Sequence, residues 1–204
     1  MIYLEELLSA DNFTLAASRI AQGFRDRYEL PLLHQLGIVV PDVEAAASTL
    51  EARDIGPFFI VSGSPVFWNE RGRIRDISVR IGLAYHKGVE LELIEPLENA
   101  EFYRDRMDPS GRMVVHHLGF LVDDVDTHAA VLEKDGMRTW VRGTIHAFPS
   151  TAQFAYMDTE ARAGIIVEYI TMRYFGLRLP MPHAVFHGLG RLEKTLGVRC
   201  MPMM

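Results

Sequence analysis

The sequence predicts an α+β fold made of two tandem modules, each with the order strand, helix and three strands. An internal repeat, the alternation of strand-like and helix-like segments within each copy, and an ordinary globular composition support this prediction. The chain has 204 residues, of which 49% are apolar and 24% charged, close to average usage in folded domains. This length suits one domain, or two small modules that share a core.

The repeat joins residues 34–54 (HQLGIVVPDVEAAASTLEARD) to residues 116–136 (HHLGFLVDDVDTHAAVLEKDG). The identical positions are spread along the whole segment, so chance explains them poorly. Each copy opens with an apolar, β-branched run that is typical of a buried strand. Asp42 or Asp124 follows and is a good helix N-cap, because its carboxylate accepts free amide hydrogens. Apolar residues at helical spacing come next, and a glycine ends each helix.

Strand-like stretches follow each helix and complete the two modules. They cover 57–62, 73–84 and 89–94 in the first copy and 137–145, 152–157 and 164–170 in the second. We therefore divide the chain into an N-terminal helical extension (1–30), a first βαβββ module (31–97), a linker (98–112), a second βαβββ module (113–171) and a C-terminal extension (172–204). Residues 11–27 have the spacing of an amphipathic helix. The C-terminal extension would pack on the modules or on a second subunit.

The net charge, the cysteine count and the length of the apolar stretches also narrow the class of protein. A net charge of −6 and a pI near 5.7, without a cluster of basic residues, disfavour nucleic acid and acidic membranes as partners. Cys200 is the single cysteine, so neither an intrachain disulfide nor a cysteine-based zinc site can form. The chain starts without the pattern of a signal peptide, and it lacks an apolar stretch of ~18 residues. We expect a soluble cytoplasmic protein.

Acidic residues inside apolar strands are the first chemical signal. Glu90 and Glu92 share one face of VELELI, and Glu168 lies in GIIVEYI. Burying an ionised carboxylate costs several kcal/mol unless a charge compensates it. A metal cation or a cross-strand arginine such as Arg80 would do so.

The strand period of two decides which other side chains share that face. It places Gln35 with Gly37 in the first copy and His117 with Gly119 in the second. His34 and His116 should point the opposite way, so we expect His116 to pack away from His117.

Four segments resemble the vicinal-oxygen-chelate superfamily, which includes glyoxalase I, methylmalonyl-CoA epimerase, extradiol dioxygenases and bleomycin-resistance binding proteins. They are HQLGIVVPDVEAA, HHLGFLVDDVDTH, VELELIEPLE and FAYMDTEARAGIIVEYI, within about residues 32–171. The resemblance implies a cupped mixed sheet and a homodimer. It also implies that Gln35, Glu92, His117 and Glu168 are metal ligands, with His34 in place of Gln35 if the register shifts by one residue.

This resemblance implies a metal-dependent lyase, isomerase or epimerase that acts on a small carbonyl compound or thioester. Such a ligand set suits Zn, Ni, Co, Mn or Mg. The cation would act as a Lewis acid, and Glu168 or Glu92 would act as the base. One alternative is a metal-free protein that sequesters a small molecule. The other is an Fe(II) extradiol-type dioxygenase, although Gln35 stands where that chemistry needs a histidine.

Overall fold

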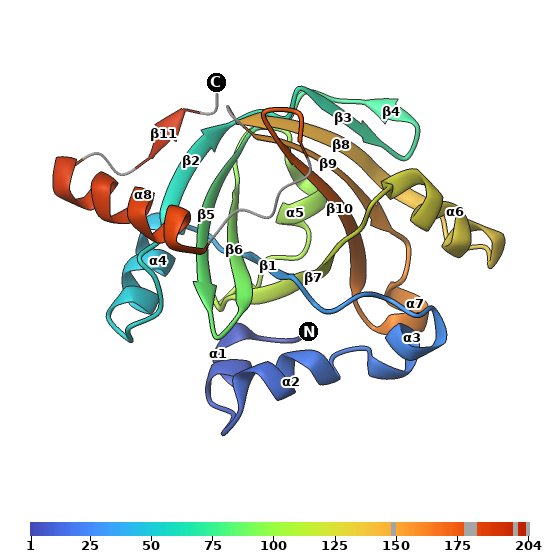
Figure 1. The fold of residues 1–204 in the computed structure, drawn as a ribbon, viewed down its shortest axis with the longest axis horizontal. Helices are drawn as coiled ribbons and strands as arrows, with labels where there is room; N and C mark the ends of the chain where they lie inside the picture. Colours follow the sequence, from blue (N-terminus) through green and yellow to red (C-terminus); the bar gives the residue numbers. More distant parts are fainter. Residues whose placement is uncertain (148–149, 178–182, 198–199, 203–204) are drawn as a thin grey trace.

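The computed structural model describes residues 1–147, 150–177, 183–197 and 200–202. These residues form one curled, mixed sheet with helices around it and α5 inside the curl (Figure 1). The α+β class and the cupped sheet are therefore confirmed. The helices are α1 (Leu4–Leu8), α2 (Phe13–Arg19), α3 (Gln22–Arg27), α4 (Val43–Glu51), α5 (Glu101–Arg104), α6 (Val125–Lys134), α7 (Glu160–Ala163) and α8 (His183–Leu196). The strands are β1 (Gln35–Val39), β2 (Phe59–Gly63), β3 (Phe67–Glu70), β4 (Arg73–Ile74), β5 (Val79–His86), β6 (Val89–Pro96), β7 (Val114–Leu121), β8 (Thr139–Ala147), β9 (Ser150–Met157), β10 (Ile166–Tyr174) and β11 (Met201–Pro202).

The strand order shows that the sheet consists of two equivalent halves. The order is β11-β2-β5-β6-β1-β7-β10-β9-β8-β3-β4. In the first half β1 pairs parallel with β6, and in the second half β7 pairs parallel with β10. The next pairs in each half are antiparallel: β5 pairs with β6 and β2 in the first half, and β9 pairs with β10 and β8 in the second. β1 and β7 pair antiparallel in the middle, so a pseudo-twofold axis relates the two copies of the sequence repeat.

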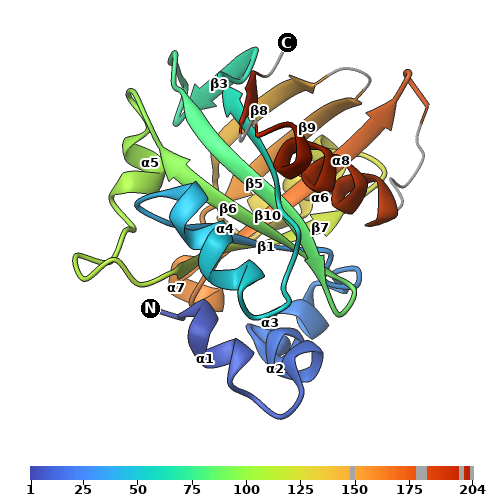
Figure 2. The same ribbon diagram turned by 90° about the vertical axis from the view of Figure 1, so that its left-hand side faces the viewer.

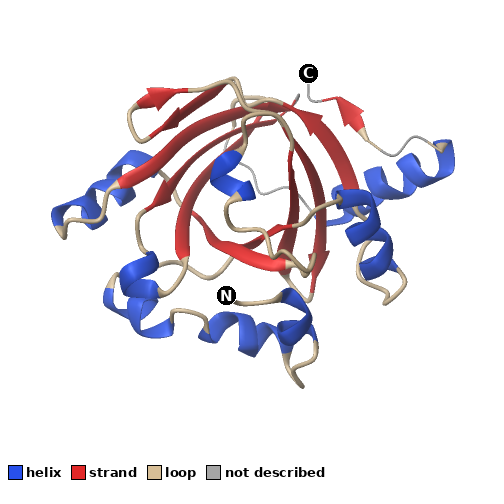
Figure 3. Ribbon diagram, turned by 180° about the vertical axis from the view of Figure 1, so that it is seen from behind, coloured by secondary structure: helices blue, strands red, loops and turns tan. Residues whose placement is uncertain are grey.

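A short connection closes the curl. β2 lies near one end of the sheet and β3 near the other, yet only residues 64–66 connect them. A fully extended chain of this length spans at most ~14 Å. The two ends of the sheet must therefore come close together, as the view from behind also shows (Figure 3).

Two apolar clusters pack on the two faces of the sheet. The convex-side cluster joins strand residues such as Leu36 and Ile38 to Val43 and Leu50 of α4. Figure 2 shows α4 lying against β5 and β6. The concave-side cluster includes Phe102 of α5, together with aromatic residues of β3 and β9. Aromatic side chains of α5, β3 and β9 thus occupy part of the inside of the cup.

Parts of the sequence prediction were wrong in detail. The stretch 73–84 was expected to be one strand, but it divides into β4 and β5, and β3 was not predicted. The single helix expected over 11–27 is broken into α2 and α3, because Ile20 is extended and Ala21 is left-handed with φ 53°. The linker contains a helical turn, α5.

The C-terminal extension packs on the first half of the sheet. A carboxylate oxygen of the buried Glu193 on α8 accepts a hydrogen bond from the backbone of Ile60 at 2.9 Å. A Cβ at Gly190 would lie 2.7 Å from the carbonyl oxygen of Phe58, so α8 approaches the backbone closely there. Among the described helices, none combines the length and the apolar character needed to cross a bilayer.

The predicted N-caps are confirmed. The Asp42 Oδ1 accepts from the Ala45 amide at 2.9 Å, and the Asp124 Oδ1 accepts from the Thr127 amide at 2.7 Å. Each carboxylate therefore satisfies one of the amides that a helix start leaves free.

Asp42→Ala should lower the free energy of unfolding by about 1 kcal/mol, because it removes this cap. Urea denaturation with an unchanged m-value measures the loss. Asp42→Asn, which keeps an acceptor at the cap, should stay close to the wild-type stability. Equal losses in both variants would contradict the capping role.

Candidate functional site

The central strands bring the predicted site residues into two adjacent rows. β1 pairs with β6 on one side and with β7 on the other, and β7 pairs with β10. The first row, across β6, β1, β7 and β10, is Glu92, Gly37, His117 and Ile166. The second row is Glu90, Gln35, Gly119 and Glu168. Residues two apart on a strand share a face, so both rows present their side chains to the inside of the cup.

Each glycine in these rows makes room for a side chain of the other half. A Cβ at Gly37 would lie 1.8 Å from the Cε1 of His117. A Cβ at Gly119 would lie 2.7 Å from the Oε1 of Gln35. The side chains of Gln35 and His117 therefore lie across the neighbouring strand, where any larger residue would exclude them.

Three of the four predicted ligands form a compact cluster. Glu92, His117 and Glu168 each offer a donor atom within 4.8 Å of the others. The His117 Nε2 lies 3.1 Å from the Glu168 Oε2 and 3.4 Å from the Glu92 Oε2. The side chain of His117 is fully buried, whereas that of Glu92 is 14% exposed. Glu92 is thus the most accessible member of the cluster.

Burial and mutual proximity set the charges of this cluster. Burial raises the pKa of Glu168, and the adjacent His117 imidazole opposes that rise. Burial alone would lower the pKa of His117, but the carboxylates of Glu168 and Glu92 outweigh it and raise the pKa. Without a metal ion, a protonated His117 would offset one of the two carboxylates. A divalent cation would replace that proton and offset both.

Gln35, the fourth predicted ligand, lies on β1 in the row next to His117. Its side chain is buried, and its Nε2 donates to the Glu90 Oε1 at 2.8 Å. Burial raises the pKa of Glu90 to about 7. Among the described residues, the buried Gln35 Oε1, His117 Nε2 and Glu168 Oε2 lack a hydrogen-bond partner of good geometry. Buried polar atoms without a hydrogen bond are costly, and these three belong to the predicted ligand set.

The donor set fits a divalent cation. It offers two carboxylates, one imidazole and one amide oxygen, which are ligands for borderline and hard divalent ions. His34, the alternative first ligand, lies just before β1 with its Nε2 3.9 Å from the Glu90 Oε2. Gln35 rather than His34 occupies the row that faces Gly119.

The expectation for His116 was wrong. The pairing of β1 with β7 shifts between Gly37 and Ile38, so a β-bulge contains His116. A bulge interrupts the alternation of faces, and the His116 Nδ1 lies 3.1 Å from the His117 Nδ1. Burial lowers the pKa of His116 well below its usual value. A neutral His116 can therefore accept a hydrogen bond from His117, which leaves the His117 Nε2 directed at the carboxylates.

Two tyrosines next to the cluster were missed by sequence reasoning. Tyr156 on β9 is the register partner of Glu168 and shares its face of the sheet. Its hydroxyl lies 2.9 Å from the hydroxyl of Tyr103 on α5. Burial raises the pKa of both tyrosines well above the usual value, so both stay protonated. The pairing of β9 with β10 could have indicated Tyr156, but no pattern in the linker indicated Tyr103.

The arginine considered as a compensator serves another acid. Arg80 pairs with Glu95 at 3.2 Å and approaches Glu44 at 3.9 Å. Arg80 therefore compensates Glu95 and Glu44 and not the acids of the cluster. The charge balance of Glu92 and Glu168 depends on His117 or on a cation.

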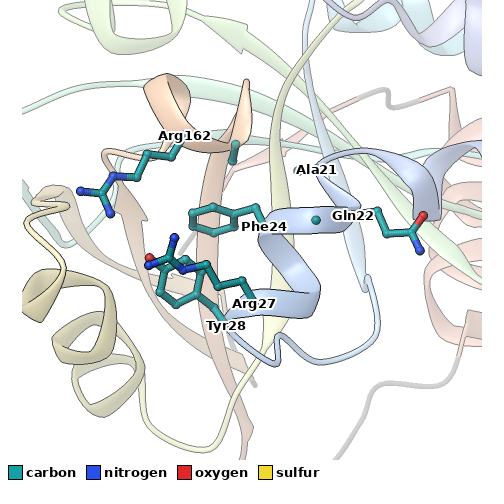
Figure 4. A pocket seen from close by; sticks show the side chains of 8 residues that line it. Ala21, Gln22, Phe24, Arg27, Tyr28 and Arg162 are labelled. Atoms are coloured by element: carbon teal, nitrogen blue, oxygen red, sulfur yellow. The ribbon is translucent and has the colours of Figure 1, made fainter.

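A pocket of about 590 Å³ lies elsewhere, between α3 and α7 (Figure 4). Phe24, Arg27, Tyr28 and Arg162 line it. The Tyr28 hydroxyl donates to the Asp135 Oδ2 at 2.6 Å, and Arg162 donates to the Asp135 carbonyl oxygen at 2.7 Å. Tyr28 thus links the end of α3, and Arg162 links α7, to the C-terminal end of α6, so the pocket lies where these helices pack together.

Comparison with known proteins agrees with the predicted resemblance. The model of the glyoxalase/bleomycin resistance protein/dioxygenase superfamily matches residues 34–156. No curated protein matches the chain.

Several solved structures are similar in fold. A singly substituted methylmalonyl-CoA epimerase from Streptomyces coelicolor, in complex with 2-nitronate-propionyl-CoA, is 19% identical with a TM-score of 0.48, over 74% of this chain and 99% of that one. The methylmalonyl-CoA epimerase from Mycobacterium tuberculosis is 19% identical with a TM-score of 0.46, over 75% and 90%. The hypothetical protein BH1468 from Bacillus halodurans C-125 is 17% identical with a TM-score of 0.43, over 68% and 91%. Likenesses this distant carry no argument about activity.

Gly37→Ala should destabilise the protein by about 1–3 kcal/mol, the usual cost of overpacking, because the added methyl group would displace the His117 ring. Chemical denaturation measures the change. Gly23→Ala is the matched control: it lies in α3 with no atom within 4 Å of the added carbon, and it should be neutral or slightly stabilising. A Gly37→Ala variant as stable as the wild type would contradict the close approach of His117.

Proposed function

Because the chain belongs to the glyoxalase/bleomycin resistance protein/dioxygenase superfamily, we propose that it is a metal-dependent isomerase, epimerase or lyase. The proposed reaction removes an α-proton from a small carbonyl compound or thioester. The observation that carries the proposal is the convergence of Glu92, His117 and Glu168 inside the cup. A divalent cation bound there would supply Lewis-acid chemistry, polarising a carbonyl oxygen and stabilising the enediolate that forms.

The residues of the site would have two roles, metal binding and proton acceptance. Gln35, Glu92, His117 and Glu168 would hold the cation. One of the two carboxylates would accept the α-proton from the substrate. Both are candidates: Glu168 is buried beside His117, and Glu92 is the more exposed.

The surroundings of the cluster support this role. The Tyr156 and Tyr103 hydroxyls form a hydrogen-bonded pair beside Glu168. They would keep that carboxylate in one orientation. The aromatic side chains of the cup would exclude water from a reactive enediolate. We also propose that the chain forms a homodimer.

Metal content is the first test. Elemental mass spectrometry on protein purified without an affinity tag should find about one divalent ion per chain, and His117→Ala should lose it. His128→Ala is the matched control, because His128 lies on the outer helix α6, and it should keep the ion. Iron would favour the dioxygenase alternative. No ion, even after addition of Ni, Co, Zn or Mn, would contradict the proposal and favour a metal-free binding protein.

Glu168→Gln tests the base. The variant should keep the fold and an oxygen ligand, but it should lose the exchange of a substrate α-proton by a factor of about 10²–10⁴, the usual contribution of general-base catalysis. Proton NMR in D2O, with thiol adducts of 2-oxoaldehydes and α-branched acyl thioesters as probes, measures this exchange. Glu98→Gln, an exposed acid after β6, is the control. Full exchange in Glu168→Gln would exclude Glu168 as the base and leave Glu92.

A further inference from the structure

We propose that Glu90 is a positioning residue that fixes the orientation of the Gln35 amide, so that the amide oxygen faces His117 and Glu168. This inference rests on the proposed function, since the orientation matters only if Gln35 binds a cation. It assigns a role to a buried acid that lies outside the predicted ligand set.

The contact between the two side chains is direct and shielded from water. The Gln35 Nε2 donates to the Glu90 Oε1 at 2.8 Å. Gln35 is 5% exposed and Glu90 is 1% exposed. The two residues are register partners on the parallel strands β1 and β6, and the Glu90 amide donates to the His34 carbonyl oxygen at 2.9 Å. The backbone ladder therefore holds the two side chains opposite each other.

The other end of the amide points toward the cluster. The Gln35 Oε1 lies over Gly119 of β7, 2.7 Å from where a Cβ would stand. Gly119 is the register partner of Glu168 and shares a face of β7 with His117. β1 lies between β6 and β7, so the amide spans the strand with its nitrogen toward Glu90 and its oxygen toward the cluster.

The Gln35 amide needs a hydrogen-bond acceptor such as Glu90 to fix its orientation, whereas His117, the equivalent residue in the other half, does not. The oxygen of an amide can bind a cation, and its NH2 group is a donor only. A flipped Gln35 would therefore present hydrogens to the cation. A carboxylate accepts hydrogen bonds, so Glu90 selects the orientation with the nitrogen on its own side. The pseudo-twofold axis relates Gln35 to His117 and Glu90 to Ile166; the imidazole has no acid at that place.

Glu90 itself is held by its own neighbours. Tyr85, its register partner on β5, forms a hydrogen bond with it. The His34 Nε2 lies 3.9 Å from its second oxygen. These contacts keep the Glu90 carboxylate fixed independently of the ligand set, as a positioning role requires.

The test is a titration of metal-free protein with Co²⁺, followed by the visible absorption of the bound ion. Glu90→Leu removes the acceptor and should weaken Co²⁺ binding by about 10–100-fold, with an altered absorption spectrum. Glu90→Met, which is unbranched, is a second variant without an acceptor in case the leucine disturbs folding. Glu90→Gln still offers an oxygen to Gln35 and should retain tight binding. Circular dichroism checks the fold of each variant.

Glu98→Leu is the matched control, because it makes the same substitution at an exposed acid that follows β6; it should bind Co²⁺ like the wild type. Unchanged affinity and spectrum in Glu90→Leu and Glu90→Met would overturn the inference. An equal loss in Glu98→Leu or in Glu90→Gln would also overturn it, since a general change in charge or packing would then explain the effect. If the wild type itself binds no divalent ion, the proposed function fails before any variant is compared.

Discussion

The fold and the site both depend on the antiparallel contact between β1 and β7. Here the two halves of the chain meet, and each half places a glycine under a side chain of the other: Gly37 under His117, and Gly119 under Gln35. A strand normally keeps its side chains in its own column. The glycines allow these two to reach across the seam, so that donor groups from separate halves occupy one small volume.

The position of the seam explains why its charges are strongly coupled. It lies at the bottom of a sheet whose two ends are tied together by residues 64–66, and α5 lies inside the curl. Water is largely excluded there, so charges interact more strongly than at a surface. The same burial raises the pKa of Glu168 and opposes protonation of His117, while the carboxylates favour it. Such a cluster is stable only when its members, or a cation, balance one another.

The repeat was sufficient to predict the two strand–helix units, their N-caps and the side chains that share the inner face, because these follow from local patterns of period two and 3.6. The position of His116 was not predictable in this way, since a bulge changes the face without changing the pattern. Tyr103 lies in a segment whose composition indicated only a linker, and its contact with Tyr156 depends on tertiary packing. β3 joins the far edge of the sheet, which no local signal encodes.

Two equivalent halves do not give an equivalent site. At positions related by the pseudo-twofold axis, Leu83 of β5 corresponds to Tyr156 of β9, since each pairs with an acid of the cluster. The same axis relates Glu90 to Ile166. One flank of the cluster therefore has a buried acid behind the Gln35 amide, and the other has a tyrosine hydroxyl beside the Glu168 carboxylate. A symmetric scaffold with such differences would distinguish the two sides of a bound carbonyl compound, because a proton acceptor and hydrogen-bond donors would then approach it from different directions. In the proposed reaction, the few positions at which the halves differ, rather than the repeat itself, would determine the stereochemistry of proton removal.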